Sequence, residues 1–161
     1  MVFGAIDIET GKFYYQINKK RVGDNFLYYL RYLVKKFKGE KSFLVLDNGR
    51  IHKSKKVSEY LLRNKDKIEL HFLPPYSPKL NPIEKLWKSI KQNNMHVRFF
   101  ENKKVFLESL EKALMIMESN VEQVLSLMSK WVFIFNLVKN ELSLKNENWN
   151  RICSCIDKAF A

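Results

Sequence analysis

The hydrophobic positions at the start of the chain follow the pattern of two strands joined by a tight turn. Residues 2–8 and 12–17 are rich in Val, Ile, Phe and Tyr, and they flank a Glu-Thr-Gly segment at 9–11. Glycine adopts the backbone conformations that such turns require more readily than other residues do. We therefore predict a β-hairpin, followed by an amphipathic helix over 25–38, where apolar residues recur at helical spacing.

A strand, a helix and a second strand are predicted next. Residues 43–46 form a short, unbroken apolar run that ends at Asp47, and residues 68–73 have the composition of another strand. Unbroken runs fit strands that are buried on both faces, as in a parallel sheet. We expect Ser54 to cap the intervening helix, which should end near residue 64. This order joins two parallel strands through a right-handed crossover, so the predicted fold class is α/β.

A further helix should begin after a proline-rich loop at 74–78, which cannot continue regular structure. Asn81 fits the cap of this helix, Pro82 its first position and Glu84 its third. Ile83, Leu86, Trp87 and Ile90 would then form the inward stripe. Glu84 would share an adjacent, exposed face with Lys88 and Lys91, at spacings of four and seven residues.

Residues 103–130 predict one or two more helices, and we expect 131–161 to form a C-terminal tail, also helical. The chain of 161 residues with 46% hydrophobic residues suffices for one domain of ordinary size. Cys153 and Cys155 lack the partner ligands of a zinc site, so we expect them to be reduced and without a role. No leader or membrane-length apolar run is present in the sequence, which predicts a soluble, cytoplasmic protein.

The charge of the chain indicates a polyanionic partner. Lys and Arg total 29 against 17 acidic residues, a formal net charge of +12. Many of the cations lie between Asp47 and Glu84, so the charge is expected to surround these two acids. Seven basic residues fall within positions 50–67: Arg50, Lys53, Lys55, Lys56, Arg63, Lys65 and Lys67.

Chain direction predicts that Asp47 and Glu84 lie near each other. Two parallel strands finish at the same edge of their sheet, and the helix that carries Glu84 begins just past that edge. Carboxylate oxygens are the ligands that Mg²⁺ prefers, and two such ions can activate the attacking oxygen and stabilise the leaving oxygen at phosphorus. We therefore expect both acids to bind divalent metal for phosphodiester chemistry on DNA.

Each of these residues also has a purely structural interpretation. Glu84 could be half of a capping box, and Asp47 before Asn48 and Gly49 could start a turn. His52 is more often a packed or hydrogen-bonded residue than a ligand, and Trp87 belongs to the core. The lysines that share a helix face with Glu84 could be ordinary solvated surface.

Three segments of the sequence together resemble the DDE transposases of the mariner-like insertion-sequence superfamily. They are LVLDNGRIHKSKKV at 44–57, LPPYSPKLNPIEKLWKSIK at 73–91 and the opening VFGAIDIETGKFYY at 2–15. The second block is long and highly specific. The resemblance covers roughly residues 2–115, and residues 131–161 resemble no family that we identify.

The resemblance implies a ribonuclease-H-like fold over 1–130, in which three acidic residues hold two Mg²⁺ or Mn²⁺ ions that cut DNA at transposon ends and join it to a target. Asp47 matches the second acid and Glu84 the third. Tyr76, Ser77, Pro78, Asn81 and Pro82 match the loop that aims the third acid, whereas the matched position of His52 has no role that we specify.

The sequence departs from this family at its first acid, which belongs to a strand before the hairpin. That strand is central in such folds, so its loss should expose backbone groups on both neighbours. Our hypothesis is the carboxyl-terminal portion of a transposase, inactive alone, with a second copy or an upstream polypeptide as a partner beside DNA. The alternatives are a basic DNA-binding remnant without chemistry, and an intact nuclease that uses Asp7 as its third acid.

Overall fold

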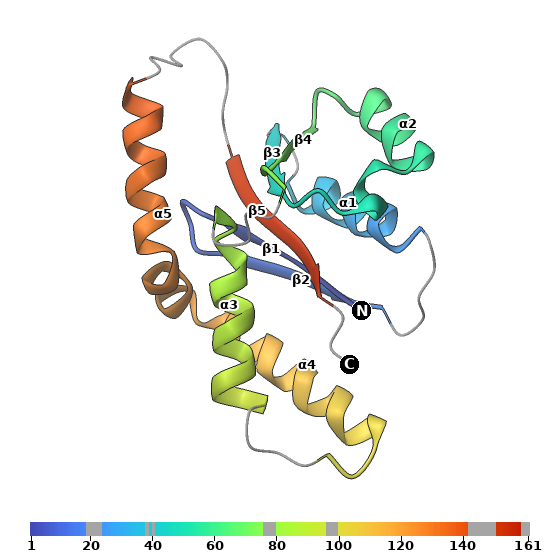
Figure 1. Cartoon of the computed structure of the whole chain (residues 1–161), viewed down its shortest axis with the longest axis vertical. Helices are drawn as coiled ribbons and strands as arrows, with labels where there is room; N and C mark the ends of the chain where they lie inside the picture. Colours follow the sequence, from blue (N-terminus) through green and yellow to red (C-terminus); the bar gives the residue numbers. More distant parts are fainter. Residues whose placement is uncertain are drawn as a thin grey trace.

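The computed structural model describes residues 1–18, 24–37, 39, 41–75, 80–95, 100–141 and 151–158. They form one mixed sheet with helices on both faces (Figure 1). The strands are β1 (Val2–Asp7), β2 (Phe13–Ile17), β3 (Ser42–Leu46), β4 (Ile68–Phe72) and β5 (Arg151–Lys158). The helices are α1 (Asn25–Lys36), α2 (Lys55–Arg63), α3 (Ile83–Ile90), α4 (Lys103–Ser119) and α5 (Val121–Glu141), with short helical turns at Arg50–Lys53 and Lys91–Met95.

The sheet has the strand order β2-β1-β5-β3-β4. The predicted hairpin is present, because β1 pairs antiparallel with β2 and Gly11 adopts a φ of 68° between them. The predicted strand, helix, strand unit is also present, because β3 and β4 are parallel neighbours joined through α2. This α/β arrangement, a mixed sheet with flanking helices, agrees with the ribonuclease-H-like fold class expected from the sequence.

The central position of the sheet, which we expected to be vacant, is occupied by β5. This strand runs antiparallel to β1, with Asp7 opposite Cys153, and parallel to β3, with Leu46 opposite Cys155 (Figure 1). The expectation of exposed backbone on both neighbours was therefore wrong, since β5 pairs with the groups that β1 and β3 present. The segment after residue 131 contains a strand as well as the end of a helix, and both cysteines belong to that strand.

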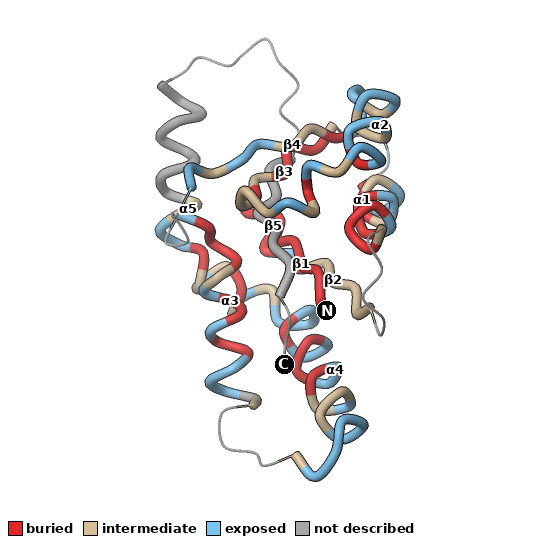
Figure 2. The backbone as a smooth tube through the Cα atoms, turned by 45° about the vertical axis from the view of Figure 1, so that its right-hand side comes forward, coloured by how far each residue is buried: buried red, intermediate tan, exposed pale blue. Residues whose placement is uncertain are grey.

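Two hydrophobic clusters lie on opposite faces of the sheet. On one face, Phe3 and Ala5 of β1 pack with α1, Val57 of α2 and the inner residues of β3 and β4. On the other face, Val2 and Ile6 of β1 pack with α3, α4 and α5. Figure 2 shows β1 as buried, together with the side of α1 that faces the sheet. Alternate residues of β1 thus contribute to both clusters, as expected for a strand covered on both faces.

Close packing of α3 on the hairpin requires a glycine in β1. The ring of Trp87 lies edge-on to Phe13, with centroids 5.8 Å apart. A Cβ atom added to Gly4 would lie 2.7 Å from Trp87 Cζ2 and 2.9 Å from Phe13, closer than side-chain atoms normally approach. The absence of a side chain at Gly4 therefore lets the indole lie directly against the strand.

One detail of helix capping differs from the prediction. Ser54 does precede α2, and its carbonyl oxygen accepts a hydrogen bond from the Ser58 N–H at 3.0 Å. Its side chain makes no capping hydrogen bond, so the backbone alone closes this end of the helix. Among the residues described, no helix is both long and apolar enough to cross a bilayer.

Introducing a proline in the middle of β5 tests whether this strand occupies the centre of the sheet. Ser154 lies opposite Ile6 of β1 and Val45 of β3. We expect Ser154→Pro to lower the free energy of unfolding by about 3 kcal/mol or more, because proline removes a ladder hydrogen bond and does not fit a central strand. Urea denaturation measures the change. Ser154→Ala keeps the backbone N–H and serves as the control; equal losses in the two variants would contradict the pairing of β5.

Candidate functional site

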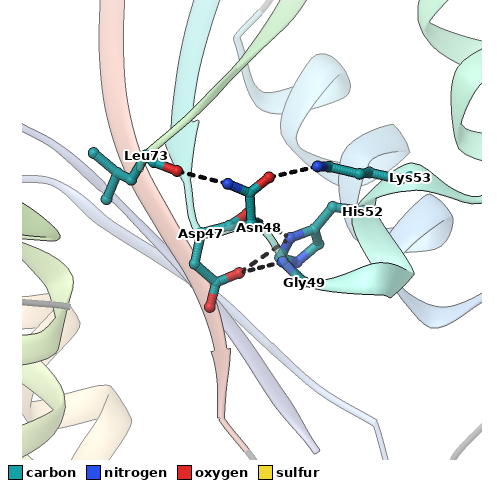
Figure 3. Close-up of polar contacts among 6 residues, drawn as sticks. All are labelled: Asp47, Asn48, Gly49, His52, Lys53 and Leu73. Atoms are coloured by element: carbon teal, nitrogen blue, oxygen red, sulfur yellow. Dashed lines mark hydrogen bonds and ion pairs between the residues drawn. The ribbon is translucent and has the colours of Figure 1, made fainter. Parts of the chain in front are cut away.

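Asp47 directly follows β3, at the edge of the sheet where β3 and β4 both end. The backbone N–H of Leu73 donates to the carbonyl oxygen of Leu46 at 2.8 Å. The side-chain amide of Asn48 donates to the carbonyl oxygen of Leu73, also at 2.8 Å (Figure 3). These bonds join the two strands at their carboxyl ends. Asp47 thus lies beside the start of the loop that leads to α3, as chain direction predicted.

The Asp47 carboxylate has a fixed orientation. Its Oδ1 accepts a hydrogen bond from the Gly49 N–H at 3.0 Å and lies 3.3 Å from Nδ1 of His52 (Figure 3). The same Nδ1 lies 3.2 Å from the Asp47 carbonyl oxygen, and since both oxygens are acceptors, the ring hydrogen belongs on Nδ1. The Asp47 side chain is 45% exposed. The turn at Asp47, which was the structural interpretation, therefore holds the carboxylate without burying it.

His52 lies between α1 and the Asp47 turn and contacts both. The imidazole is buried, and its centroid lies 4.4 Å from that of Phe26 in the first turn of α1. A Cβ atom added to Gly49 would lie 3.1 Å from both Asp47 Oδ1 and the His52 ring. The space between the turn and the ring is therefore matched to glycine. His52 is the packed, hydrogen-bonded residue that its structural interpretation predicted, and it also orients Asp47.

Glu84 lies in the first turn of α3. Backbone hydrogen bonds from Glu84 to Asn81 (3.2 Å) and from Lys85 to Pro82 (3.1 Å) close this turn. Pro82 has helical dihedral angles, φ −58° and ψ −36°, but it takes the capping position that we predicted for Asn81, because α3 begins at Ile83. Glu84 is partly exposed, and Lys88 is exposed. The predicted inward stripe is buried in full: Ile83, Leu86, Trp87 and Ile90.

The helix that carries Glu84 packs over strands next to the strand that ends before Asp47. Helix α3 contacts β1 and β5, and β5 is the direct neighbour of β3, which ends at Asp47. The strand that completes the sheet therefore lies between the helix of Glu84 and the strand of Asp47. Within the described part of the chain, no group of three or more His, Cys, Asp or Glu side chains could hold a metal ion.

Asp7 has a local role in the hairpin turn. Its Oδ1 accepts hydrogen bonds from the backbone N–H groups of Glu9 and Thr10, both at 3.1 Å, and the residue is buried. Cys153 of β5 lies opposite Asp7 on one side and Leu44 on the other. Asp7 therefore has the same height in the sheet as Leu44, which is three residues before Asp47. The structure therefore does not bring Asp7 to the edge that carries Asp47.

The loop before α3 is described only at its two ends. Tyr76, Ser77 and Pro78, which the resemblance assigns to this loop, lie outside the described residues. Asn81 and Pro82 are both buried, so the entry into α3 is packed against the rest of the protein.

Comparison with protein families agrees with this arrangement of strands and helices. The family model described as "DDE superfamily endonuclease" matches residues 1–106, about two thirds of the chain. The chain belongs to this family of DDE superfamily endonucleases. The match includes the hairpin, the Asp47 edge and α3, and it stops before most of α4, all of α5 and β5.

One relative of this DDE endonuclease chain is the "Uncharacterized protein y4pE/y4sA" of Sinorhizobium fredii. The two are 38% identical over 64 residues, which is 40% of this chain and 44% of that protein. The alignment thus spans less than half of the relative's length, and the printed name gives no activity to compare.

The basic residues of this DDE domain divide between two edges of the sheet. Arg50, Lys53, Lys55 and Lys56 lie between Asp47 and the start of α2, and all are exposed. Arg63 ends α2, whose nine residues extend for about 13 Å, and Lys65 and Lys67 follow it. The Lys67 carbonyl accepts from the Ser42 N–H at 2.9 Å, which places Lys67 at the opposite edge. Our expectation that the charge surrounds the two acids therefore applies to the first four residues only.

Two residues beside Asp47, Asn48 and Lys53, make contacts that the sequence did not predict. Asn48 bridges the strands, and Lys53 Nζ donates to Asn48 Oδ1 at 2.5 Å (Figure 3). The same Nζ lies 4.8 Å from the centroid of the Phe72 ring. The only sequence signal was the position of Asn48 directly after a predicted strand end. Nearby, a hydrogen bond from Lys56 to Asp24 at 2.6 Å raises the pKa of Lys56, which keeps this amine charged.

Replacing the buried histidine tests the packing behind Asp47. We expect His52→Ala to lower the free energy of unfolding by about 2 kcal/mol, since it leaves a cavity against Phe26 and removes the ring donor near Asp47. His71→Ala, at an exposed position at the end of β4, should change stability by less than about 0.5 kcal/mol. Urea denaturation of both variants decides; equal effects would show that His52 has no special structural role.

Proposed function

We propose that this DDE endonuclease domain binds divalent metal ions through Asp47 and Glu84 and uses them in phosphodiester chemistry on DNA, as in transposition. The observation that carries the proposal is the Asp47 turn. A half-exposed carboxylate at the carboxyl end of a strand is oriented by a backbone N–H and a buried histidine. Metal-binding carboxylates commonly have such hydrogen-bonded support around them.

The side chains at this edge suit a hard cation. Asp47 and Glu84 both offer carboxylate oxygens, the donors that Mg²⁺ and Mn²⁺ prefer, and both are partly exposed to solvent. His52 Nδ1 is turned towards Asp47 oxygens, so it supports the acid from behind. The DNA backbone would approach from the solvent side of this edge, where Arg50 and Lys55 are exposed.

Bound metal ions would supply Lewis-acid activation of a phosphoryl oxygen and of the attacking water or hydroxyl. The chain's own residues hold the geometry. Gly49 and His52 keep the Asp47 carboxylate in one orientation, and α3 presents Glu84 from a packed helix end. Exposed cations at the start of α2 would neutralise backbone phosphates and steer DNA to this edge.

We also propose that the chain alone has little or no cleavage activity. The family resemblance implies three acids, whereas only Asp47 and Glu84 match its motifs, and Asp7 accepts hydrogen bonds within the hairpin turn. A second copy of the chain or a separate polypeptide would then complete the ligand set. Transposon ends and target DNA are the substrates that the resemblance implies.

Metal binding by matched acid variants tests the site. We expect Asp47→Asn and Glu84→Gln each to weaken Mn²⁺ binding by tenfold or more, because each removes a charged ligand. Isothermal titration calorimetry measures the affinity. Asp66→Asn and Glu59→Gln, which make the same chemical changes at exposed positions on and after α2, should leave it unchanged.

The proposal fails if the site variants bind Mn²⁺ as well as the control variants do. A nicking assay on supercoiled plasmid with Mg²⁺ tests the cleavage activity separately. Robust nicking that Asp47→Ala or Glu84→Ala abolishes would show that the isolated chain holds a complete site.

A second candidate function, DNA binding without cleavage, is favoured by the exposed cations before and at the start of α2. Arg50 and Lys55 lie beside the Asp47 edge, whereas Lys65 and Lys67 lie towards the opposite edge. If DNA lies across the Asp47 edge, only the first pair contacts phosphates.

Salt dependence distinguishes these two surfaces. Each phosphate that the protein neutralises adds about 0.9 to the slope of log affinity against log salt concentration. We expect Arg50→Gln with Lys55→Gln to lower that slope by about 2, and Lys65→Gln with Lys67→Gln to leave it unchanged. Fluorescence anisotropy with a duplex oligonucleotide across salt concentrations measures the slope. Equal effects of the two pairs would mean that DNA does not select the Asp47 edge.

A further inference from the structure

Helix α5 lies beyond the part of the chain that matches the family, yet it packs directly on the helix that carries Glu84. Val124 and Met128 are fully buried in the same cluster as Ile83 and Leu86 of α3. The next turn of α5 continues this contact, and Val132 packs against Ile8 and Phe43 on the same side of the sheet. The position of α3 therefore depends on a segment outside the family match.

Trp131 contacts the chain on both sides of Glu84. Its indole Nε1–H donates a hydrogen bond to the carbonyl oxygen of Leu80, at 3.3 Å, just before α3 begins. The Nζ of Lys85, the residue after Glu84, lies 4.6 Å from the centroid of the Trp131 ring. One side chain of α5 thus holds the entry to α3 through a backbone acceptor and its first turn through a cation–π contact.

The first turn of α3 needs such support for a carboxylate to be placed accurately. Helix α3 has eight residues, and helices this short are not stable by themselves. The buried stripe fixes the side of the helix that faces the sheet, whereas Glu84 lies on an adjacent, partly exposed face. Metal ligands must be held to within about 0.5 Å, so movement at Leu80 or Lys85 would displace the Glu84 carboxylate.

We propose that Trp131 is a positioning residue for Glu84, holding the amino-terminal end of α3 so that the carboxylate is placed for metal binding. The inference rests on the proposed function only in taking Glu84 as a metal ligand. It assigns a role at the site to the segment that follows the family match.

Two substitutions separate the two contacts. Trp131→Phe removes the N–H donor to Leu80 and keeps an aromatic ring for Lys85, whereas Trp131→Ala removes both. Val124→Ala is the control for a general loss of α5 packing, because Val124 is buried in the shared cluster. Lys130→Ala, on the same turn of α5 as Trp131, controls for a change at an exposed position.

Hydrogen exchange of the Glu84, Lys85 and Leu86 amides reports directly on the end of α3. Relative to global stability measured by urea denaturation, we expect Trp131→Ala to speed exchange at these amides by about tenfold. Trp131→Phe should have an intermediate effect, and Val124→Ala should have none once its loss of global stability is taken into account. Unchanged exchange in Trp131→Ala, or the same pattern in Val124→Ala, would overturn the proposal.

Measurements of Mn²⁺ affinity then test whether Trp131 acts through Glu84. Trp131→Ala should weaken Mn²⁺ binding by about tenfold in the wild-type chain and have no further effect in Glu84→Gln. An equal effect in both backgrounds would show that Trp131 does not act through Glu84, which contradicts the proposal. If Asp47→Asn and Glu84→Gln leave Mn²⁺ affinity unchanged, the proposed function fails, whereas the exchange measurement still decides whether Trp131 holds α3.

Discussion

Backbone hydrogen bonds on both sides of β5 join the two halves of the sheet. Without this strand, the β1–β2 hairpin and the β3–β4 pair would share no strand contact, because β5 is the neighbour of both β1 and β3. The parts of the chain that carry the candidate site are likewise joined through β5. Asp47 follows β3, and the helix of Glu84 packs over β1 and β5, so β5 connects the two parts of the chain that carry these acids.

Much of the fold follows from local hydrophobic patterns in the sequence. The hairpin, the strand before Asp47, the crossover helix and the inward stripe of α3 all have strong periodicity, and the structure shows each within two residues of its predicted bounds. The strand β5 has no such pattern, because its eight residues mix Ile and Cys with Arg, Ser, Asp and Lys. What identifies it is the set of backbone groups that its neighbours leave unpaired. That information lies in pairing across the whole chain, and local sequence patterns do not contain it.

The positions of Asp47 and Glu84 among the elements of the fold were predictable for the same reason. Chain direction placed Asp47 beside Leu73 and Glu84 at the start of α3, because both follow from the order of elements. The contacts that support Asp47 could not be predicted from local sequence patterns. The contact of His52 with Phe26 and the hydrogen bond from Asn48 to Leu73 join residues that are 26 and 25 positions apart. The distribution of charge shows a similar limit: seven cations that are close in sequence divide between two edges once α2 separates them.

The place of β5 in the chain also constrains the order of synthesis and folding. Asp7 pairs with Cys153, so one of the innermost contacts of the sheet connects residues near opposite ends of the sequence. A ribosome that has released the hairpin, both parallel strands and α3 has not yet released the strand that unites them. Contacts of such long sequence separation form slowly, and until they form the edges of β1 and β3 remain open to other chains. During translation, the edges of β1 and β3 therefore stay unpaired for longer than those in a domain whose central strand emerges first.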